Sequence, residues 1–118
     1  MAASYRLRFY FDTGSNICLW SDNDAARERF DYPVELRELP LPQTIRLRGY
    51  FLIAWFDTFM DWDNAPEPSR WWPREGAAFN LASQELLTLL REHLGPDFEL
   101  VDKSRTADST VPGAAPGT

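Results

Sequence analysis

The sequence predicts a small α+β domain: an antiparallel sheet covered on one face by two long helices and one short helix, in the order β-β-α-α-α-β. Three observations predict it. Apolar and polar residues alternate in residues 5–12, two long segments at 43–62 and 74–94 have helical spacing, and a short alternating segment follows at 98–102. A chain of 118 residues with 44% hydrophobic residues is long enough for one domain with its own core.

The strands are expected to form a hairpin joined by a C-terminal strand. Residues 5–12 alternate with a period of two and are rich in aromatics, which is typical of a half-buried strand. Residues 13–16 include Gly and Asn, which tolerate positive φ, so we expect a turn there and a second strand at 17–20. The strand at 98–102 is expected to complete the antiparallel sheet. Its acids would pair with bases on the outer face, a set comprising Arg6, Arg8, Glu99 and Asp102.

A short helix is expected at residues 24–31. Ser21 or Asp22 can cap it, because a side-chain oxygen there accepts a hydrogen bond from a free N–H of the first turn. A proline two residues after this segment disfavours helical geometry and ends the helix. Residues 33–42 contain three prolines and predict an ordered connector, with one turn at 35–38.

The first long helix is expected at residues 43–62, a segment too long for one strand. At 100° per residue, Phe51 falls on the wide apolar side, whereas Tyr50 and Ile53 fall on a narrow opposite stripe. A helix this apolar is expected to be largely buried.

The second long helix is expected at residues 74–94. Phe79, Leu86, Leu90 and His93 share one face, so we expect His93, the only histidine, to pack there. The Gly-Pro pair that follows residue 94 provides a cap and then a helix breaker.

We expect the folded domain to span residues 1–102. Residues 103–118 are expected to form a flexible tail, because small and polar residues bury too little surface to offset the cost of ordering them.

The composition excludes several function classes. Eighteen acids and 12 bases give a net charge of −6, which opposes binding to nucleic acid and favours a basic protein partner. No apolar run is long enough to span a membrane, and the first residues do not resemble a signal peptide, so we expect a cytoplasmic protein. The single cysteine, Cys18, excludes an internal disulfide and a cysteine zinc site. We predict no cofactor, no metal and no enzymatic activity.

The stretch from Asp57 to Trp72 is the main candidate site. Its acids, two of them four residues apart near the end of a helix, face only Arg70. Like charges at that spacing and at that helix end are unfavourable, so either arginines of this chain or an external cationic partner must compensate them. Two alternatives stay open: a binding surface, or solvated acids beside tryptophans that cover the core. The predicted partner-binding residues are Asp57, Asp61, Trp62, Asp63, Glu67 and Trp71, with Asp22 and Asp24 as a second acidic choice.

Two alternative functions follow from other residues. The run Asp12-Thr13-Gly14-Ser15 matches the signature of aspartic proteases, which need two aspartates and would require a homodimer here. The match ends after four residues, and a hairpin turn explains it equally. The second alternative is a nucleic-acid-binding sheet with Arg6, Arg8 and Tyr10 on its outer face, which the net acidity opposes.

Four segments carry a resemblance to a known group of proteins. They are residues 7–12 (Leu-Arg-Phe-Tyr-Phe-Asp), 19–26 (Leu-Trp-Ser-Asp-Asn-Asp-Ala-Ala), 56–63 and 90–95. In these the chain resembles the immunity proteins of contact-dependent inhibition and polymorphic toxin systems, over most of residues 5–102. The resemblance implies a cytoplasmic inhibitor that covers the active site of a cognate toxin domain, often a basic nuclease. It implies no catalytic residues, because such proteins act by binding.

Overall fold

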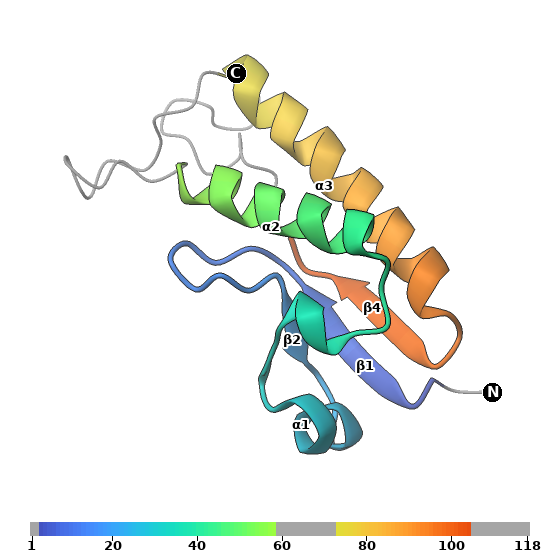
Figure 1. Cartoon of the computed structure of the whole chain (residues 1–118). Coiled ribbons are helices and arrows are strands. Elements are labelled where there is room, and N and C mark those ends of the chain that lie inside the picture. The colour runs from blue at the N-terminus through green and yellow to red at the C-terminus, as the bar shows by residue number, and fades with distance from the viewer. Residues whose placement is uncertain (1–2, 59–72, 105–118) are drawn as a thin grey trace.

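The computed structural model describes residues 3–58 and 73–104 and confirms the α+β class. Figure 1 shows α2 and α3 running side by side across one face of a sheet, with α1 near one end of it. The elements are β1 (Tyr5–Phe9), β2 (Leu19–Ser21), α1 (Asp24–Phe30), β3 (Pro33–Val34), the 3-10 helix η1 (Leu36–Glu38), α2 (Gln43–Asp57), α3 (Pro73–Leu94) and β4 (Phe98–Asp102).

The sheet has four strands in the order β3-β2-β1-β4, and it is mixed. The prediction of three antiparallel strands is wrong in two respects: β3 adds a fourth strand, and β4 runs parallel to β1. The cause lies in α3, whose 22 residues bring the chain back to the start of β1. There the N–H of Tyr5 donates to the carbonyl of Asp97 at 2.9 Å, and β4 then follows β1 in the same direction. Parallel neighbours need such a crossover connection, which the helices provide.

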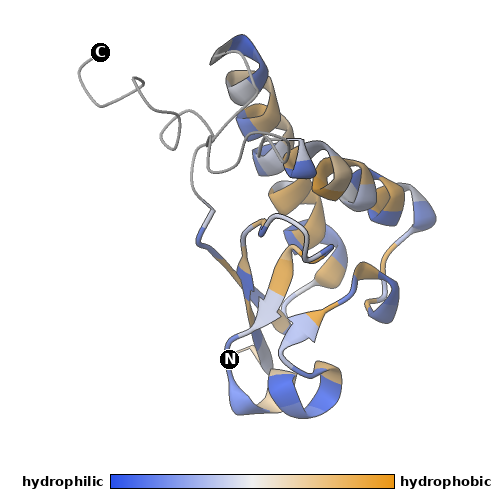
Figure 2. Cartoon of the chain, turned by 90° about the vertical axis from the view of Figure 1, so that its left-hand side faces the viewer, coloured by the Kyte–Doolittle hydropathy of each residue, from blue (hydrophilic) through white to orange (hydrophobic). Residues whose placement is uncertain are grey.

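One face of the sheet forms the core. Leu7 and Phe9 are fully buried, and the register sets Leu7 beside Leu100 of β4 and Phe9 beside Leu19 of β2. Phe11 continues the alternation beyond the strand and packs edge-on against Phe79 of α3, with ring centroids 5.2 Å apart. Figure 2 shows mostly hydrophilic residues in α1, whereas α2 and α3 alternate between apolar and polar residues. The alternation predicted for residues 5–12 is therefore confirmed, although the strand itself ends at Phe9.

Helix α2 packs on the core with part of its predicted apolar side, but the prediction is wrong at two positions. Ile53 is buried and Phe51 is 66% exposed, the reverse of the expectation. Its core face includes Gly49, which lies against Leu36 of η1. The run from Tyr50 to Phe56 is apolar all round the helix, so periodicity cannot choose the side that faces the sheet. Asp57 is the last residue of α2, and the predicted continuation to residue 62 lies outside the described residues.

Helix α3 agrees with its prediction in extent and in most of its buried face. Phe79, Leu86 and Leu90 are buried. His93 is exposed, contrary to the expectation, because the last turn of α3 packs on the core through Leu90 and Leu94 instead. Gly95 has a φ of +79°, as the predicted left-handed cap requires.

Asp102, the last residue of β4, is held against α3. Gln84 Nε2 donates to its Oδ2 at 3.1 Å, and the backbone N–H of Ser104 donates to its Oδ1 at 2.9 Å. Partial burial works to raise the pKa of Asp102, but the hydrogen bonds from Ser104 and Gln84 and the charge of Arg91 outweigh it and lower the pKa. Residues 105–118 of the predicted tail lie outside the described residues.

The junction between β2 and α1 differs in detail from the prediction. The cap of α1 is Asn23, whose Oδ1 accepts a hydrogen bond from the N–H of Ala26 at 2.9 Å, rather than Ser21 or Asp22. Ser21 is the last residue of β2 and is fully buried, with its hydroxyl donating to the carbonyl of Asp31 at 2.5 Å. That bond fixes the turn after α1, where Asp31 has a φ of 67°.

Cys18 is a buried core residue. It is 1% exposed, and burial raises the pKa of its thiol to about 12. Among the described helices, none has the length and apolarity to cross a lipid bilayer.

Candidate functional site

Asp57 is the only member of the main predicted site among the described residues. It ends α2, and its Oδ1 accepts a hydrogen bond from the N–H of Gly14 at 3.0 Å, so it ties the β1–β2 hairpin turn to the helix. This contact gives Asp57 an internal structural role at a helix end where an acid is otherwise unfavourable. The other predicted residues of this surface lie outside the described residues: Asp61, Trp62, Asp63, Glu67 and Trp71.

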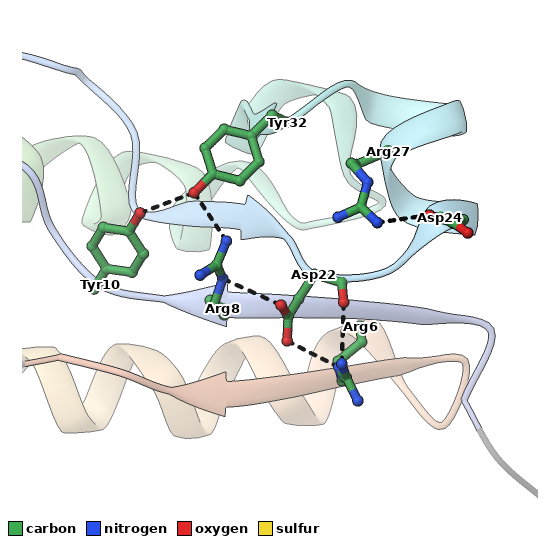
Figure 3. A network of polar contacts seen from close by, with 7 residues as sticks. All are labelled: Arg6, Arg8, Tyr10, Asp22, Asp24, Arg27 and Tyr32. Atoms are coloured by element: carbon green, nitrogen blue, oxygen red, sulfur yellow. Dashed lines mark hydrogen bonds and ion pairs between the residues drawn. The ribbon is translucent and has the colours of Figure 1, made fainter.

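Asp22 is compensated within the chain. Its Oδ2 lies 2.9 Å from Nε of Arg6, and its Oδ1 lies 3.4 Å from Nε of Arg8 (Figure 3). The prediction paired the arginines of β1 with Glu99 or Asp102. They pair instead with Asp22, directly after β2, because β1 and β2 are antiparallel neighbours. A carboxylate held by two guanidinium groups is a poor choice for a partner's cation, so Asp22 is removed from the candidate site.

Asp24 lies at the surface and keeps most of its accessibility. Its Oδ1 forms an ion pair with Nη2 of Arg27 at 2.7 Å, three residues on in α1, and its side chain is 99% exposed (Figure 3). Such a pair contributes little to stability and is easily exchanged for another cation. Asp24 therefore remains accessible to a partner, on the first turn of α1.

The outer face of the sheet carries an aromatic cluster that is closed on itself. The rings of Tyr10 and Trp20 stack with centroids 5.0 Å apart, and Trp20 Nε1 donates to the carbonyl of Tyr10 at 3.1 Å. Arg8 Nη2 donates to the hydroxyl of Tyr32 at 2.9 Å, and that hydroxyl lies 3.4 Å from the hydroxyl of Tyr10 (Figure 3). Burial and the contact with Tyr32 raise the pKa of Tyr10 to about 12. Both the rings and the nearby cations are thus engaged with residues of this chain.

The Asp-Thr-Gly-Ser run forms the predicted hairpin turn. The carbonyl of Asp12 accepts hydrogen bonds from the N–H of Ser15 at 3.1 Å and from its hydroxyl at 2.6 Å. Gly14 and Asn16 have positive φ values of 82° and 63°, as the turn prediction required. In residues 3–58 and 73–104, no three His, Cys, Asp or Glu side chains gather in a way that could hold a metal ion.

An open groove of about 510 Å³ lies beside the edge strand β3. Part of its wall is apolar and includes Trp20 of β2 and Pro33 of β3. Its acids come from the turn after α1 and from η1. We call this concavity the β3 groove; its lining residues are Ser15, Ile17, Trp20, Phe30, Asp31, Pro33, Glu35 and Glu38.

Two acids of the β3 groove, Glu35 and Glu38, are held in place at the start of η1. Glu38 Oε2 accepts the N–H of Glu35 at 3.1 Å, which completes a capping box at the start of η1. Glu35 Oε2 lies 2.6 Å from Nε of Arg37, a residue that is itself mostly exposed. Within the described part of the chain, no basic side chain forms an ion pair with Asp31 or Glu38. The groove therefore has more acidic than basic groups around an apolar wall.

Sequence reasoning missed this groove. Its three acids lie within eight residues of one another around Pro33, and the prediction treated that region as a connector without a site. The signal that could have identified it is the run of acids alternating with apolar residues on both sides of the proline.

The comparisons with known proteins add no relative to this geometry: the chain matches no protein-family model, and its sequence matches no curated protein.

Proposed function

We propose that this chain is an immunity protein, an inhibitor that binds a basic toxin domain and neutralises it, with the β3 groove as part of its contact surface. The observation that carries the proposal is the composition of the groove, in which Asp31, Glu35 and Glu38 lie close to Trp20 and Pro33. The resemblance to immunity proteins, stated above, agrees with the acidic chemistry of this surface.

The groove has the chemistry to receive an arginine or lysine side chain of the partner. The methylene groups of such a side chain can lie on Trp20 and Pro33, since long basic side chains bury their stems against apolar surfaces. The charged end then lies among the carboxylates of the groove. The partner's basic side chain would displace water from the carboxylates and from the apolar wall. The groove therefore favours binding of a basic protein and disfavours binding of an acidic one.

The charge of the whole chain acts in the same direction. A net charge of −6 on 118 residues attracts a basic partner at long range and raises the rate of encounter. A toxin cleft that holds substrate phosphates is itself basic, so carboxylates of the inhibitor can take the place of those phosphates. The chain then inhibits by occupying the cleft, which needs no catalytic group of its own.

Growth protection and direct binding test the proposal. The probe is the C-terminal domain of the protein encoded by the adjacent reading frame, expressed in cells with and without this chain. We expect the chain to restore growth and to form a one-to-one complex that weakens as salt is added, because screening acts on the charge contacts. Absence of both protection and a complex would refute the function.

A matched pair of double variants tests the site. Asp31→Asn with Glu38→Gln removes two charges from the groove while it keeps the shapes of both side chains and the acceptor of the capping box. Glu92→Gln with Glu99→Gln removes the same charge from exposed positions on α3 and β4. We expect the groove variant to lower affinity about tenfold or more, since charge pairs at an interface carry on the order of 1.5 kcal/mol or more each. Equal losses in the two variants would mean that only net charge matters, and would refute the groove as the contact surface.

A further inference from the structure

Helix α2 has an apolar stripe that faces away from the sheet. Leu47 is 56% exposed, Tyr50 is 39% exposed and Phe51 is 66% exposed, and Ala54 is also exposed. The spacing i, i+3, i+4, i+7 places all four on one side of the helix, as in the face that a helix normally buries. We call these four residues the α2 stripe. The opposite side, with Ile45, Leu52 and Ile53, packs into the core, so α2 is apolar on two faces and only one of them is covered.

The apolar surface extends onto α3. Two polar contacts between the antiparallel helices indicate how they are aligned: Arg48 lies 3.8 Å from Glu85, and Trp55 Nε1 donates to Glu75 at 2.9 Å. Midway between these two contacts, Phe51 of α2 and Leu81 of α3 lie at about the same height along the helix pair. Leu81 is 64% exposed, so the outer side of the helical layer has large apolar groups on both helices at the same height.

This surface has little net charge, although the chain as a whole is acidic. The charged residues of α2 are Arg46, Arg48 and Asp57. Arg46 Nη2 donates to the carbonyl of Leu39 at 2.7 Å, Arg48 pairs with Glu85, and Asp57 accepts the N–H of Gly14. A basic partner gains no electrostatic attraction here. A second copy of this chain, which would be repelled by the acids of most other surfaces, can approach this one.

The stripe is also complementary to itself. If two α2 helices cross antiparallel about a twofold axis between Tyr50 and Phe51, Leu47 of one copy faces Ala54 of the other, and Tyr50 faces Phe51. A large side chain then meets a small one at each end, and two Tyr–Phe pairs, one on each side of the axis, meet in the middle. Isologous contacts of this kind close after two copies and do not propagate into fibres.

We infer that the α2 stripe, with Leu81 beside it, is the interface of a weak homodimer of this chain. A 15-residue helix is about 22 Å long and a helix with side chains is about 10 Å wide, so the α2 of each copy offers roughly 220 Å² in projection. Stable interfaces bury about 800 Å² per partner, so this surface suits a dimer that dissociates on dilution. The inference does not depend on the proposed function, because it uses a different surface and a different partner.

Sedimentation of the full chain over a wide range of concentrations tests the inference. We expect the weight-average mass to rise from the monomer toward the dimer, and Phe51→Asp or Leu81→Asp to keep the protein monomeric at concentrations where the unmodified chain pairs. Ala25→Asp is the matched control, because it adds the same charge at an exposed position of α1 and is expected to leave the dimer intact. A chain that stays monomeric throughout, or dimers that persist in both Asp variants, would overturn the inference. So would loss of the toxin complex in Phe51→Asp with a monomeric parent, which would assign the stripe to the toxin.

Oxidative crosslinking tests the antiparallel arrangement separately from stability. Chains with Leu47→Cys and chains with Ala54→Cys are expected to form a disulfide dimer when they are mixed. Either variant alone is expected to crosslink poorly, because equivalent positions then lie about 10 Å apart along the helices. Cys18 is buried and does not compete. Crosslinking that is equally efficient in the separate variants would exclude the proposed twofold axis.

Discussion

Gly49 gives the most direct test of how tightly α2 is packed. A Cβ atom built on Gly49 overlaps with Cδ1 of Leu36 and comes within 3.6 Å of its Cγ. Replacing Gly by Ala inside a helix normally stabilises it by about 1 kcal/mol. Leu36 is only 2% exposed, so it cannot rotate into solvent, and an extra methyl in a packed core costs about 1–3 kcal/mol. We therefore expect Gly49→Ala to lower the free energy of unfolding by about 1 kcal/mol, against the helix propensity.

Denaturant unfolding followed by circular dichroism measures this effect. Ala54→Gly makes the reverse substitution at an exposed position of the same helix. It therefore measures the difference in helix propensity between Ala and Gly, with the opposite sign. In a Leu36→Ala background the new methyl enters space that the leucine has left, so Gly49→Ala should then stabilise the protein. A coupling of at least about 0.5 kcal/mol between the two positions is expected. If Gly49→Ala raises stability as much as propensity alone predicts, the packing of η1 on α2 described above is wrong.

Three further outcomes can be checked on the same protein. Asn23→Ala removes the cap of α1 and should lower the free energy of unfolding by about 1 kcal/mol, whereas Ser and Asp at this position should keep most of it. Because the native pKa of Asp102 is lowered, its carboxylate stabilises the fold above its unfolded pKa of about 3.9, and this contribution is lost as pH falls through the lower native value. Unfolding measured against pH should therefore show the cost of Asp102→Asn at neutral pH and a shrinking cost in acid. Cys18, with its pKa raised to about 12 and its side chain buried, should react with a thiol reagent at the rate of unfolding, and fast labelling of the native protein would contradict its core placement.

Local signals in the sequence were sufficient for the turns and for α3. Gly14 and Asn16 predicted the hairpin turn because few other residues accept positive φ, and both positions have it. The direction of β4 has no such signal, because it depends on where a long helix ends relative to the first strand. Strand β3 was not predicted because it has only two residues and one of them is Pro33, a residue type that argues against a strand. Phe51 and Ile53 of α2 were mispredicted because both faces of the helix are apolar, and only tertiary packing distinguishes Ile53 from Phe51.

The candidate site was harder to predict than the fold. Acids in a sequence do not reveal their partners, and the arginines that compensate Asp22 lie 14 and 16 residues earlier, on a strand that folding brings alongside. Asp57 was expected to be compensated by arginines of this chain or by an external cation, yet a backbone N–H from a turn 43 residues away contacts it. The β3 groove arises from a bend in the chain at Asp31, a left-handed conformation that no residue pattern in this segment indicated.

The position of β1 in the sheet has a consequence for folding while the chain is being synthesised. Strand β1 is synthesised before β2 and β4, the two strands between which it lies, and β4 is the last element of the described residues. Until β4 has been synthesised, one edge of β1 keeps unpaired backbone groups, the kind of edge that recruits foreign strands. Synthesis of β4, rather than the pairing of the hairpin, is therefore the step that completes the sheet, and any truncation before residue 98 should leave a product that aggregates.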